Sequence, residues 1–255
     1  MTDNYYQRKY VVVVADVSTS MAGAKIDICN QFIRDLYAFY QADEYLSEII
    51  DMSIIASDAE KAIDIAPTHS VQQIVPPVLQ VQETTADVFM GISLAQELIE
   101  ERKDYYKSHA IAYHRPLIIL LTDGDITFPA EKIYEDRFYY SLMEEMITKK
   151  RYMLLTIGVG DMEEKLMDAV KSRFPLIKTM EEVYAEFQTI FSESSPSWMY
   201  GAIKEIEKNY IPEPQPEIPI DSWLTSFDFL TEDTRVSNSE CNVYIDENGK
   251  VTFEI

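Results

Sequence analysis

The stretch that decides the fold is residues 10–21, which read YVVVVADVSTSM. Its four consecutive valines form a β-branched apolar run that is too short to cross a membrane and is bounded by polar residues. This composition predicts a strand buried on both faces of a parallel sheet. Asp16, Ser18 and Ser20 follow the run, so one carboxylate and two hydroxyls are expected in the crevice beyond the carboxyl end of the sheet.

The donors at this strand end are oxygen atoms alone, with no thiolate or imidazole among them. Such a set suits a hard divalent cation such as Mg²⁺. The pentapeptide by itself also allows a plainer interpretation, a strand-to-helix loop in which a serine caps the helix. The rest of the chain has to decide between them.

Strand and helix patterns alternate along most of the chain. Apolar residues at helical spacing predict helices over residues 24–40, from 87 onward, 131–149, 162–172, 181–191 and 196–208. Continuous apolar runs predict further strands over residues 50–56, 117–121, 152–159 and 176–178.

One more strand is expected at residues 62–66, directly after the strand at 50–56. No long helical pattern separates the two, so they are predicted to pair antiparallel, with the shorter one at the sheet edge. Pro67, Pro76 and Pro77 then indicate an irregular connection. The fold class is therefore α/β: a doubly wound, mostly parallel six-stranded sheet with one short antiparallel edge strand.

Three segments divide the chain. Residues 1–210 are expected to form the α/β domain, and the proline-rich residues 211–220 a semi-rigid linker. In the tail, 221–255, apolar and polar residues alternate on both sides of Asn248-Gly249, which predicts a β-hairpin. Because an isolated hairpin is marginal in water, we expect the tail to dock on the domain or on a partner.

The net charge of −22 excludes two classes of partner. A chain this acidic repels nucleic acid and anionic membrane surfaces. The sequence shows no apolar signal region at its start and no stretch of membrane-spanning length, so the cytoplasm is the expected compartment. Cys29 and Cys241 make no metal-binding spacing, and a buried or inert thiol is expected at each.

A second acidic strand end appears at Thr122-Asp123-Gly124, about 107 residues after the first. Asp16, Ser18 and Ser20 match the D-x-S-x-S signature of the metal-ion-dependent adhesion site of von Willebrand factor A domains. In those domains a T-D-G at this place supplies a second site aspartate, and Asp123 matches it. The chain therefore resembles the von Willebrand A family over about residues 9–200.

Within that family the chain is most similar to bacterial proteins associated with tellurium resistance, the TerY-like group. The similarity lies in residues 20–23, in Pro76-Pro77, and in the aromatic helix at 181–191 with the serines that follow it. It implies a cytoplasmic scaffold in a bacterial stress or defence system, with a kinase and a phosphatase as partners.

The third ligand loop departs from the family pattern. Where the family has Gly-Gly-Thr before a helix, this chain has ETTAD at residues 83–87. Counting forward from Pro76 places Thr85 at the ligand position, whereas counting backward from Gly91 places Ala86 there. If Ala86 holds the position, the site loses one hydroxyl.

The resemblance implies a role for each site residue. Ser18 and Ser20 would coordinate the ion directly, with Thr85 as a third hydroxyl, and Asp16 and Asp123 directly or through water. The expected ion is Mg²⁺, with Mn²⁺ or Ca²⁺ as substitutes, and an open position would accept an Asp or Glu from a protein partner. Further acids that could lie on the same rim are Asp87, Asp125 and Asp161.

No His, Lys or Cys stands in the sequence as a base or nucleophile beside the signature. We therefore expect a non-enzymatic, metal-dependent protein-binding module. One alternative is a Mg²⁺-dependent phosphohydrolase with Asp16 as nucleophile, although Ser18 stands where such an enzyme needs a second carboxylate. The other alternative is a scaffold that keeps the fold and has a degenerate, metal-free site.

Overall fold

The computed structural model describes residues 6–73, 75–124, 141–160, 176–192 and 201–204, and the backbone of two strands in the tail. The chain divides into two compact units, Met1–Tyr210 and Ile211–Ile255. Each unit is described by itself below.

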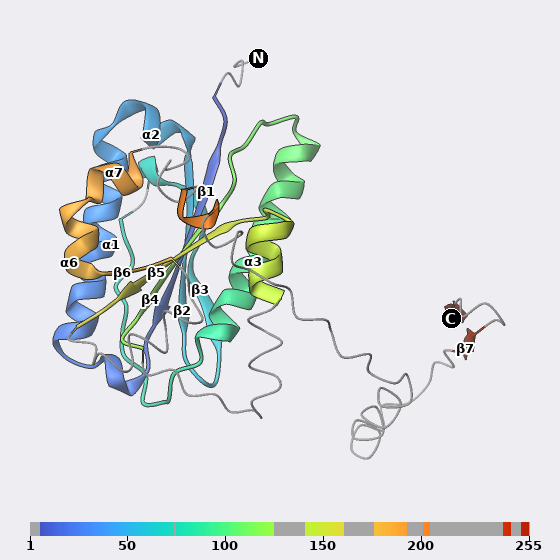
Figure 1. Cartoon of the computed structure of the whole chain (residues 1–255), viewed down its shortest axis with the longest axis horizontal. Helices are drawn as coiled ribbons and strands as arrows, with labels where there is room; N and C mark the ends of the chain where they lie inside the picture. Colours follow the sequence, from blue (N-terminus) through green and yellow to red (C-terminus); the bar gives the residue numbers. More distant parts are fainter. Residues whose placement is uncertain are drawn as a thin grey trace. The chain divides into compact units, whose positions relative to one another are not determined.

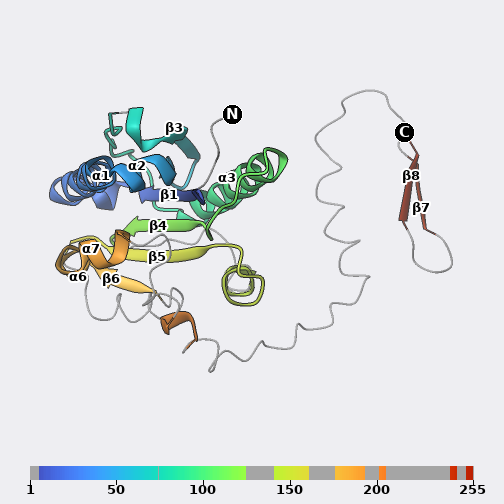
Figure 2. The same cartoon turned by 90° about the horizontal axis from the view of Figure 1, so that it is seen from above.

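Within the described residues of the first unit, six strands form one sheet in the order β3-β2-β1-β4-β5-β6 (Figure 2). The pairs β2-β1, β1-β4, β4-β5 and β5-β6 are parallel, and the edge pair β2-β3 is antiparallel. The strands are β1 (Lys9–Asp16), β2 (Ile50–Ser57), β3 (Ala62–Ser70), β4 (Leu117–Thr122), β5 (Met153–Gly158) and β6 (Ile177–Thr179). The predicted fold class is confirmed.

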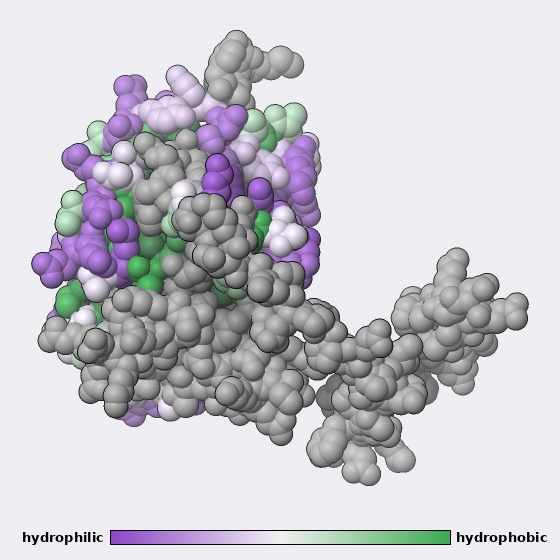
Figure 3. Space-filling model, viewed as in Figure 1, coloured by the Kyte–Doolittle hydropathy of each residue, from purple (hydrophilic) through white to green (hydrophobic). Residues whose placement is uncertain are grey.

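Helices cover both faces of the sheet. In Figures 1 and 2, α1, α6 and α7 lie on one face and α3 lies on the other. The described helices are α1 (Ala24–Ala42), α2 (Glu44–Ile49), α3 (Val88–Ser108), α6 (Met180–Ala185) and α7 (Phe187–Phe191), with short turns η1 (Thr19–Met21), η2 (Val71–Gln73) and η3 (Glu144–Thr148). The outer surfaces of α1 and α3 are largely hydrophilic in Figure 3, as expected for helices that bury one stripe against a sheet.

The valine run forms the centre of the core. Every residue of β1 is buried, and the four valines at 11–14 have no exposed surface. They alternate between the two faces, so each face of the central strand packs against a helical layer. On the α3 side, Gly91 lets the helix approach the sheet closely, because an added Cβ would lie 2.5 Å from Val14 Cγ1 and 2.8 Å from Ser57 Cβ.

The edge strand is longer than the sequence predicted. β3 continues past residue 66 to Ser70 and includes Pro67, which we expected to begin the irregular connection. Its pairing with β2 shifts register twice, between Met52 and Ile54 and between Ile54 and Ile55. Bulges on an edge strand accommodate a proline, because its missing N–H removes no ladder bond there.

Four helix predictions need correction or lie partly or wholly outside the described residues, and one helix was not predicted. Helix α2 was not predicted, and the helix expected at 181–191 is two helices, α6 and α7, that meet at Glu186 with φ −116° and ψ 17°. Of the helix predicted at 131–149, only its end from residue 141 is described, and it includes the π turn η3. The helix predicted at 162–172 is outside the described residues, and residues 201–204 of the one predicted at 196–208 are helical.

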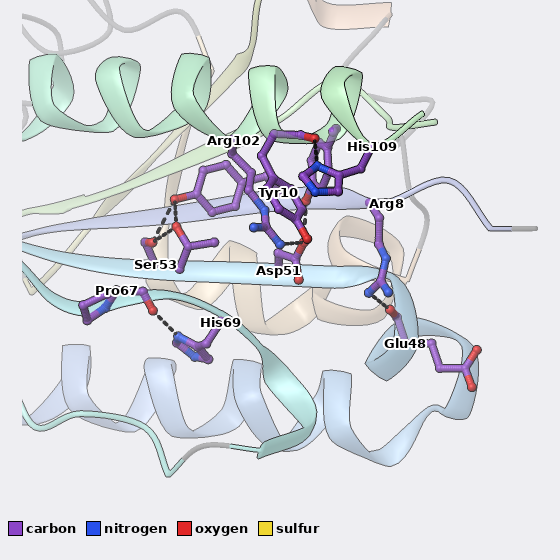
Figure 4. Close-up of polar contacts among 12 residues, drawn as sticks. Arg8, Tyr10, Glu48, Asp51, Ser53, Pro67, His69, Arg102 and His109 are labelled. Carbon is purple, nitrogen blue, oxygen red and sulfur yellow. Dashed lines mark hydrogen bonds and ion pairs between the residues drawn. The ribbon is translucent and has the colours of Figure 1, made fainter. Parts of the chain in front are cut away.

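Polar networks join the elements near the amino end of β1. The Tyr10 hydroxyl lies 2.8 Å from both Ser53 Oγ and Thr68 Oγ1, which links the three strands β1, β2 and β3 (Figure 4). Arg102 and Tyr106 of α3 both donate to the buried carboxylate of Asp51, over 2.6 and 2.5 Å. These bonds satisfy buried polar groups. They also fix α3 against the sheet, and β3 to its neighbouring strands, at the end opposite to Asp16.

In the second unit, strands β7 (Asn242–Ile245) and β8 (Val251–Glu254) pair antiparallel. Val243 pairs with Phe253 and Tyr244 with Thr252, so the alternation on both sides of Asn248-Gly249 corresponds to a strand pair. The predicted tail hairpin is confirmed at the level of its two strands.

Candidate metal centre

The site lies where the direction of chain winding reverses. β1 and β4 are adjacent and parallel, but β2, β3 and α3 come between them in the chain. In an open α/β sheet, the connections of two such strands leave toward opposite faces and a crevice opens beyond their carboxyl ends. Ala15 pairs with Leu121, so Asp16 and Thr122 end the two strands side by side. The two acidic strand ends found in the sequence therefore meet at one place.

Asp16 is fully buried, and its carboxylate accepts hydrogen bonds from the loop after β1 and from the end of β4. One carboxylate oxygen, Oδ1, accepts the backbone N–H of Ser18 over 2.9 Å, and the other, Oδ2, accepts the Thr122 hydroxyl over 3.3 Å. Burial is the main cause that raises the pKa of Asp16 to about 6, and the charge of Asp123 adds to it. The raised pKa means that burial disfavours the ionised form of Asp16. A positive charge nearby would stabilise that form.

The two serines converge just after the strand. Ser18 is buried, and its Oγ lies 3.1 Å from Ser20 Oγ. Their proximity follows from the short turn η1, in which the Met21 N–H donates to the Ser18 carbonyl over 3.0 Å. Gly23, with φ 76°, then allows the chain to turn into α1. Four predicted donors, from residues 16, 18, 20 and 123, therefore gather at the ends of β1 and β4.

Asp123 is buried, with 4% of its surface exposed, and it forms an ion pair that the sequence analysis missed. The ammonium of Lys25, in the first turn of α1, lies 2.6 Å from Asp123 Oδ2 and 3.1 Å from the backbone carbonyl of Ser20. From the sequence we expected no lysine to act as a base or nucleophile beside the signature, and the fold places the Lys25 ammonium against Asp123. The available signal was its position five residues after Ser20, at the start of the predicted helix.

The third loop is fixed by its backbone. The Thr19 N–H donates to the Thr84 carbonyl and the Ala59 N–H donates to the Thr85 carbonyl, both over 2.9 Å. The side chain of Thr85 is exposed, whereas Ala86 is 2% exposed. No described contact places the Thr85 hydroxyl against Asp16, Ser18 or Ser20, so its role as a ligand stays a prediction.

Of the three further acids expected on the rim of the site, Asp87 caps a helix, and the other two lie outside the described residues. The Asp87 side chain accepts the N–H groups of Phe89 and Met90 and caps α3. This carboxylate serves the helix N-terminus, as an N-cap residue does. Asp125 and Asp161, which we placed on the same rim, lie outside the described residues.

The donors that the structure gathers fit a hard divalent cation. They are two carboxylates and two hydroxyls, the oxygen ligands that Mg²⁺, Mn²⁺ and Ca²⁺ take in proteins. Among the residues that the structure describes, no group of three or more His, Cys, Asp or Glu side chains forms a metal cluster. A site here therefore depends on hydroxyl ligands, as the D-x-S-x-S spacing predicts.

Comparisons with solved structures agree with this architecture. The pilus adhesin SpaC from Lactobacillus rhamnosus GG superposes with a TM-score of 0.51 at 10% sequence identity, over 81% of this chain and 31% of the adhesin chain. This chain thus spans about a third of the adhesin's length. The mostly parallel six-stranded sheet with its antiparallel edge is the fold class predicted from the sequence. The chain has a von Willebrand A-like fold.

Two other structures are similar at lower TM-scores. The VWA domain of SpRpn10 gives 0.40 at 11% identity, over 78% of this chain and 95% of that domain. The N-terminal domain of TFIIH p34 gives 0.45 at 12% identity, over 82% of this chain and all of that domain. No family model and no curated protein matches the sequence. In the described part of the chain, no helix combines the length and apolar character needed to cross a membrane.

Proposed function

We propose that this von Willebrand A-like domain binds another protein through the carboxyl-terminal edge of its sheet, in a divalent-metal-dependent manner, and that it catalyses no reaction. The observation that carries the proposal is the meeting of Asp16 and Asp123, two buried carboxylates at neighbouring strand ends. Burying two carboxylates together is costly unless a positive charge accompanies them. A bound cation would supply that charge.

Asp16, Ser18, Ser20 and Asp123 are the residues that would hold the ion, with Thr85 as a fifth candidate. A bound Mg²⁺ would supply an open coordination position suited to an Asp or Glu of the partner. The protein's own contribution is to hold the oxygen donors in place. Hydrogen bonds from Ser18 N–H and Thr122 to Asp16 already fix the orientation of one carboxylate.

The surface next to the site offers apolar contact area. A groove of about 190 Å³ runs beside the D-x-S-x-S loop. It is lined by Val17 of that loop, by residues of β2 and β3, and by the 78–82 connection, among them Ile63 and Val78. Of these lining residues, Val78 is 67% exposed. Exposed apolar residues beside a polar site are typical of an interaction surface. A net charge of −22 favours a partner that is basic overall.

The proposed partners and compartment come from the resemblance to the tellurium-resistance group. That resemblance supports a cytoplasmic scaffold in a bacterial stress or defence system, bound to a kinase and a phosphatase. The phosphohydrolase alternative is less well supported, because Asp16 is buried and both of its oxygens accept hydrogen bonds. A nucleophile has to be accessible to its substrate.

A second candidate function is a scaffold that works without metal. The Lys25–Asp123 ion pair favours it, because the ammonium already places a positive charge at the site. In that case the partner would be recognised by the shape of the loops and of the groove.

Pull-down of the partner with the full chain as bait tests the proposal. Capture in Mg²⁺ should be lost in a chelator and in the double variant Asp16→Ala with Asp123→Ala. The matched control is Glu101→Ala with Asp104→Ala, which removes two exposed acids from α3 and should capture normally. Capture that survives both the chelator and the site variant would contradict metal dependence and favour the metal-free scaffold.

A further inference from the structure

Lys25 is placed differently from an ordinary surface lysine. Its ammonium donates to a buried carboxylate, Asp123, and to the backbone carbonyl of Ser20. Ser20 lies in the loop after β1 and Asp123 in the loop after β4, and these two loops carry the candidate ligands. By contrast, the Lys107–Asp104 pair on α3 is an i,i+3 pair whose side chains are 57% and 74% exposed. Exposed pairs of that kind contribute little.

The aliphatic part of the Lys25 side chain packs against Gly160. A Cβ added to Gly160 would lie 3.3 Å from both Cε and Cγ of Lys25, which is tighter than most Cβ contacts in proteins. Gly160 has φ +79° and follows β5, so the stem runs from the start of α1 across the turn after β5 to the end of β4. Two features unrelated in sequence, a glycine and a buried carboxylate, therefore accommodate one lysine.

We propose that Lys25 is a built-in cation that competes with the divalent ion for Asp123, and that it thereby sets the ion concentration at which the site loads. This inference rests on the proposed metal-binding function and adds a regulatory element to it. In one state the ammonium pairs with Asp123. In the other the ion takes the carboxylate, and the lysine head moves into solvent, which its 36% exposed side chain can reach.

Electrostatics make the two states exclusive. An ammonium and a divalent ion at the same carboxylate oxygen would lie within a few ångströms of each other, where repulsion between like charges is strong in a partly buried site. Moving a lysine head requires only side-chain rotations, so the exchange needs no change in the backbone. A chain with this device would keep its site charge-compensated at low Mg²⁺ and bind its metal-bridged partner only at higher concentrations.

Calorimetric titration of the full chain with Mn²⁺ alone tests the competition. Lys25→Met keeps the length of the stem and removes the charge, so its Mn²⁺ affinity should exceed that of wild type by about tenfold or more. Lys25→Arg keeps the positive charge and should bind no more tightly than wild type. The matched control is Lys107→Met, which removes an ion-paired lysine away from the site and should leave the affinity unchanged.

A second measurement uses the wild-type protein, and so does not depend on the folding of any variant. Labelling of Lys25 by an amine-reactive ester, followed by mass spectrometry, should accelerate when Mn²⁺ is added, relative to Lys107 in the same sample. Unchanged labelling would overturn the exchange of the two cations.

The outcomes separate this inference from the function on which it rests. Equal or weaker Mn²⁺ binding by Lys25→Met, with clear binding by wild type, overturns the competition and leaves the metal site standing. Absence of Mn²⁺ binding in wild type and in every variant overturns both.

Discussion

At the scale of single residues, Asp16 shows how burial and charge oppose each other. Its pKa is raised from 3.8 to about 6, so the folded state holds the proton more tightly than the unfolded state does. The stability that this preference contributes is fully present below pH 3.8, and it is lost as the pH rises through about 6. At neutral pH the buried carboxylate of Asp16 is therefore destabilising, and a bound cation would offset that cost.

The corresponding prediction concerns Asp16→Asn in a buffer with chelator. The amide can accept from the Ser18 N–H and donate to Thr122 Oγ1, so above pH 6 the variant should be more stable than wild type, by on the order of 2 kcal/mol. Urea unfolding as a function of pH measures this, and the two proteins should converge below pH 4. Asp104→Asn, at an exposed site, is the control and should change little. A variant less stable than wild type at pH 7 would contradict the argument.

At the scale of elements, the connection from β3 to α3 is the part that positions the third loop. Asn30 of α1 binds the backbone of this connection at Leu79. The Asn30 Nδ2 donates to the Leu79 carbonyl over 3.1 Å, and the Asn30 Oδ1 accepts the Leu79 N–H over 2.7 Å. Farther along, the Gln82 N–H donates to the Val17 carbonyl over 2.7 Å. The backbone groups of this irregular segment are thus hydrogen-bonded by the Asn30 side chain and by the backbone of the D-x-S-x-S loop, as neighbouring strands would bond them in a sheet.

We predict that Asn30→Ala destabilises the domain by about 2 to 4 kcal/mol, because two buried backbone groups of Leu79 lose their partners. Thermal or urea unfolding measures the loss. Mn²⁺ affinity should fall as well, because the loop that carries Thr85 and packs against Thr19 loosens. Gln31→Ala is the matched control: Gln31 is exposed and pairs with Asp35 and Arg34 on the same helix, so little change is expected. Full stability of Asn30→Ala would show that the connection is held by other contacts.

At the scale of the whole molecule, the second unit has to be stabilised by something beyond its own strand pair. Two strands of four residues each are marginal in water. Because β7 and β8 nevertheless pair in register, we expect them to dock on the first unit or on the partner.

Hydrogen exchange of the full chain measures this docking. Amides of Asn242–Ile245 and Val251–Glu254 should exchange more slowly than those of the proline-rich linker at 211–220, either in the free protein or once the partner is bound. A chain truncated after residue 210 should lose that unit and keep its Mn²⁺ affinity. Exchange in both strands as fast as in the linker, with and without partner, would rule out docking.

The sequence by itself determined the fold class and the two acidic strand ends. An apolar β-branched run predicts a buried central strand, because burial on both faces leaves no place for polar residues, and β1 is buried throughout. Ligand loops in this architecture follow strand ends, so Asp16 and Asp123 could be identified from their positions after residues 11–14 and 117–121.

Only the tertiary structure decided how distant groups face each other. The pairs Lys25–Asp123 and Asn30–Leu79 are 98 and 49 residues apart, and hydrophobic periodicity carries no information about polar partners across such separations. The extension of β3 through Pro67 could not be predicted from the sequence either. Pro67 is a local signal for a turn, but pairing with β2, with two shifts of register, keeps the chain extended there. The exposure of Thr85 and burial of Ala86 depend on bonds from Thr19 and Ala59, which the chain's order alone does not reveal. Local composition determines which segments are buried, whereas the packing of those segments against one another determines which charges meet.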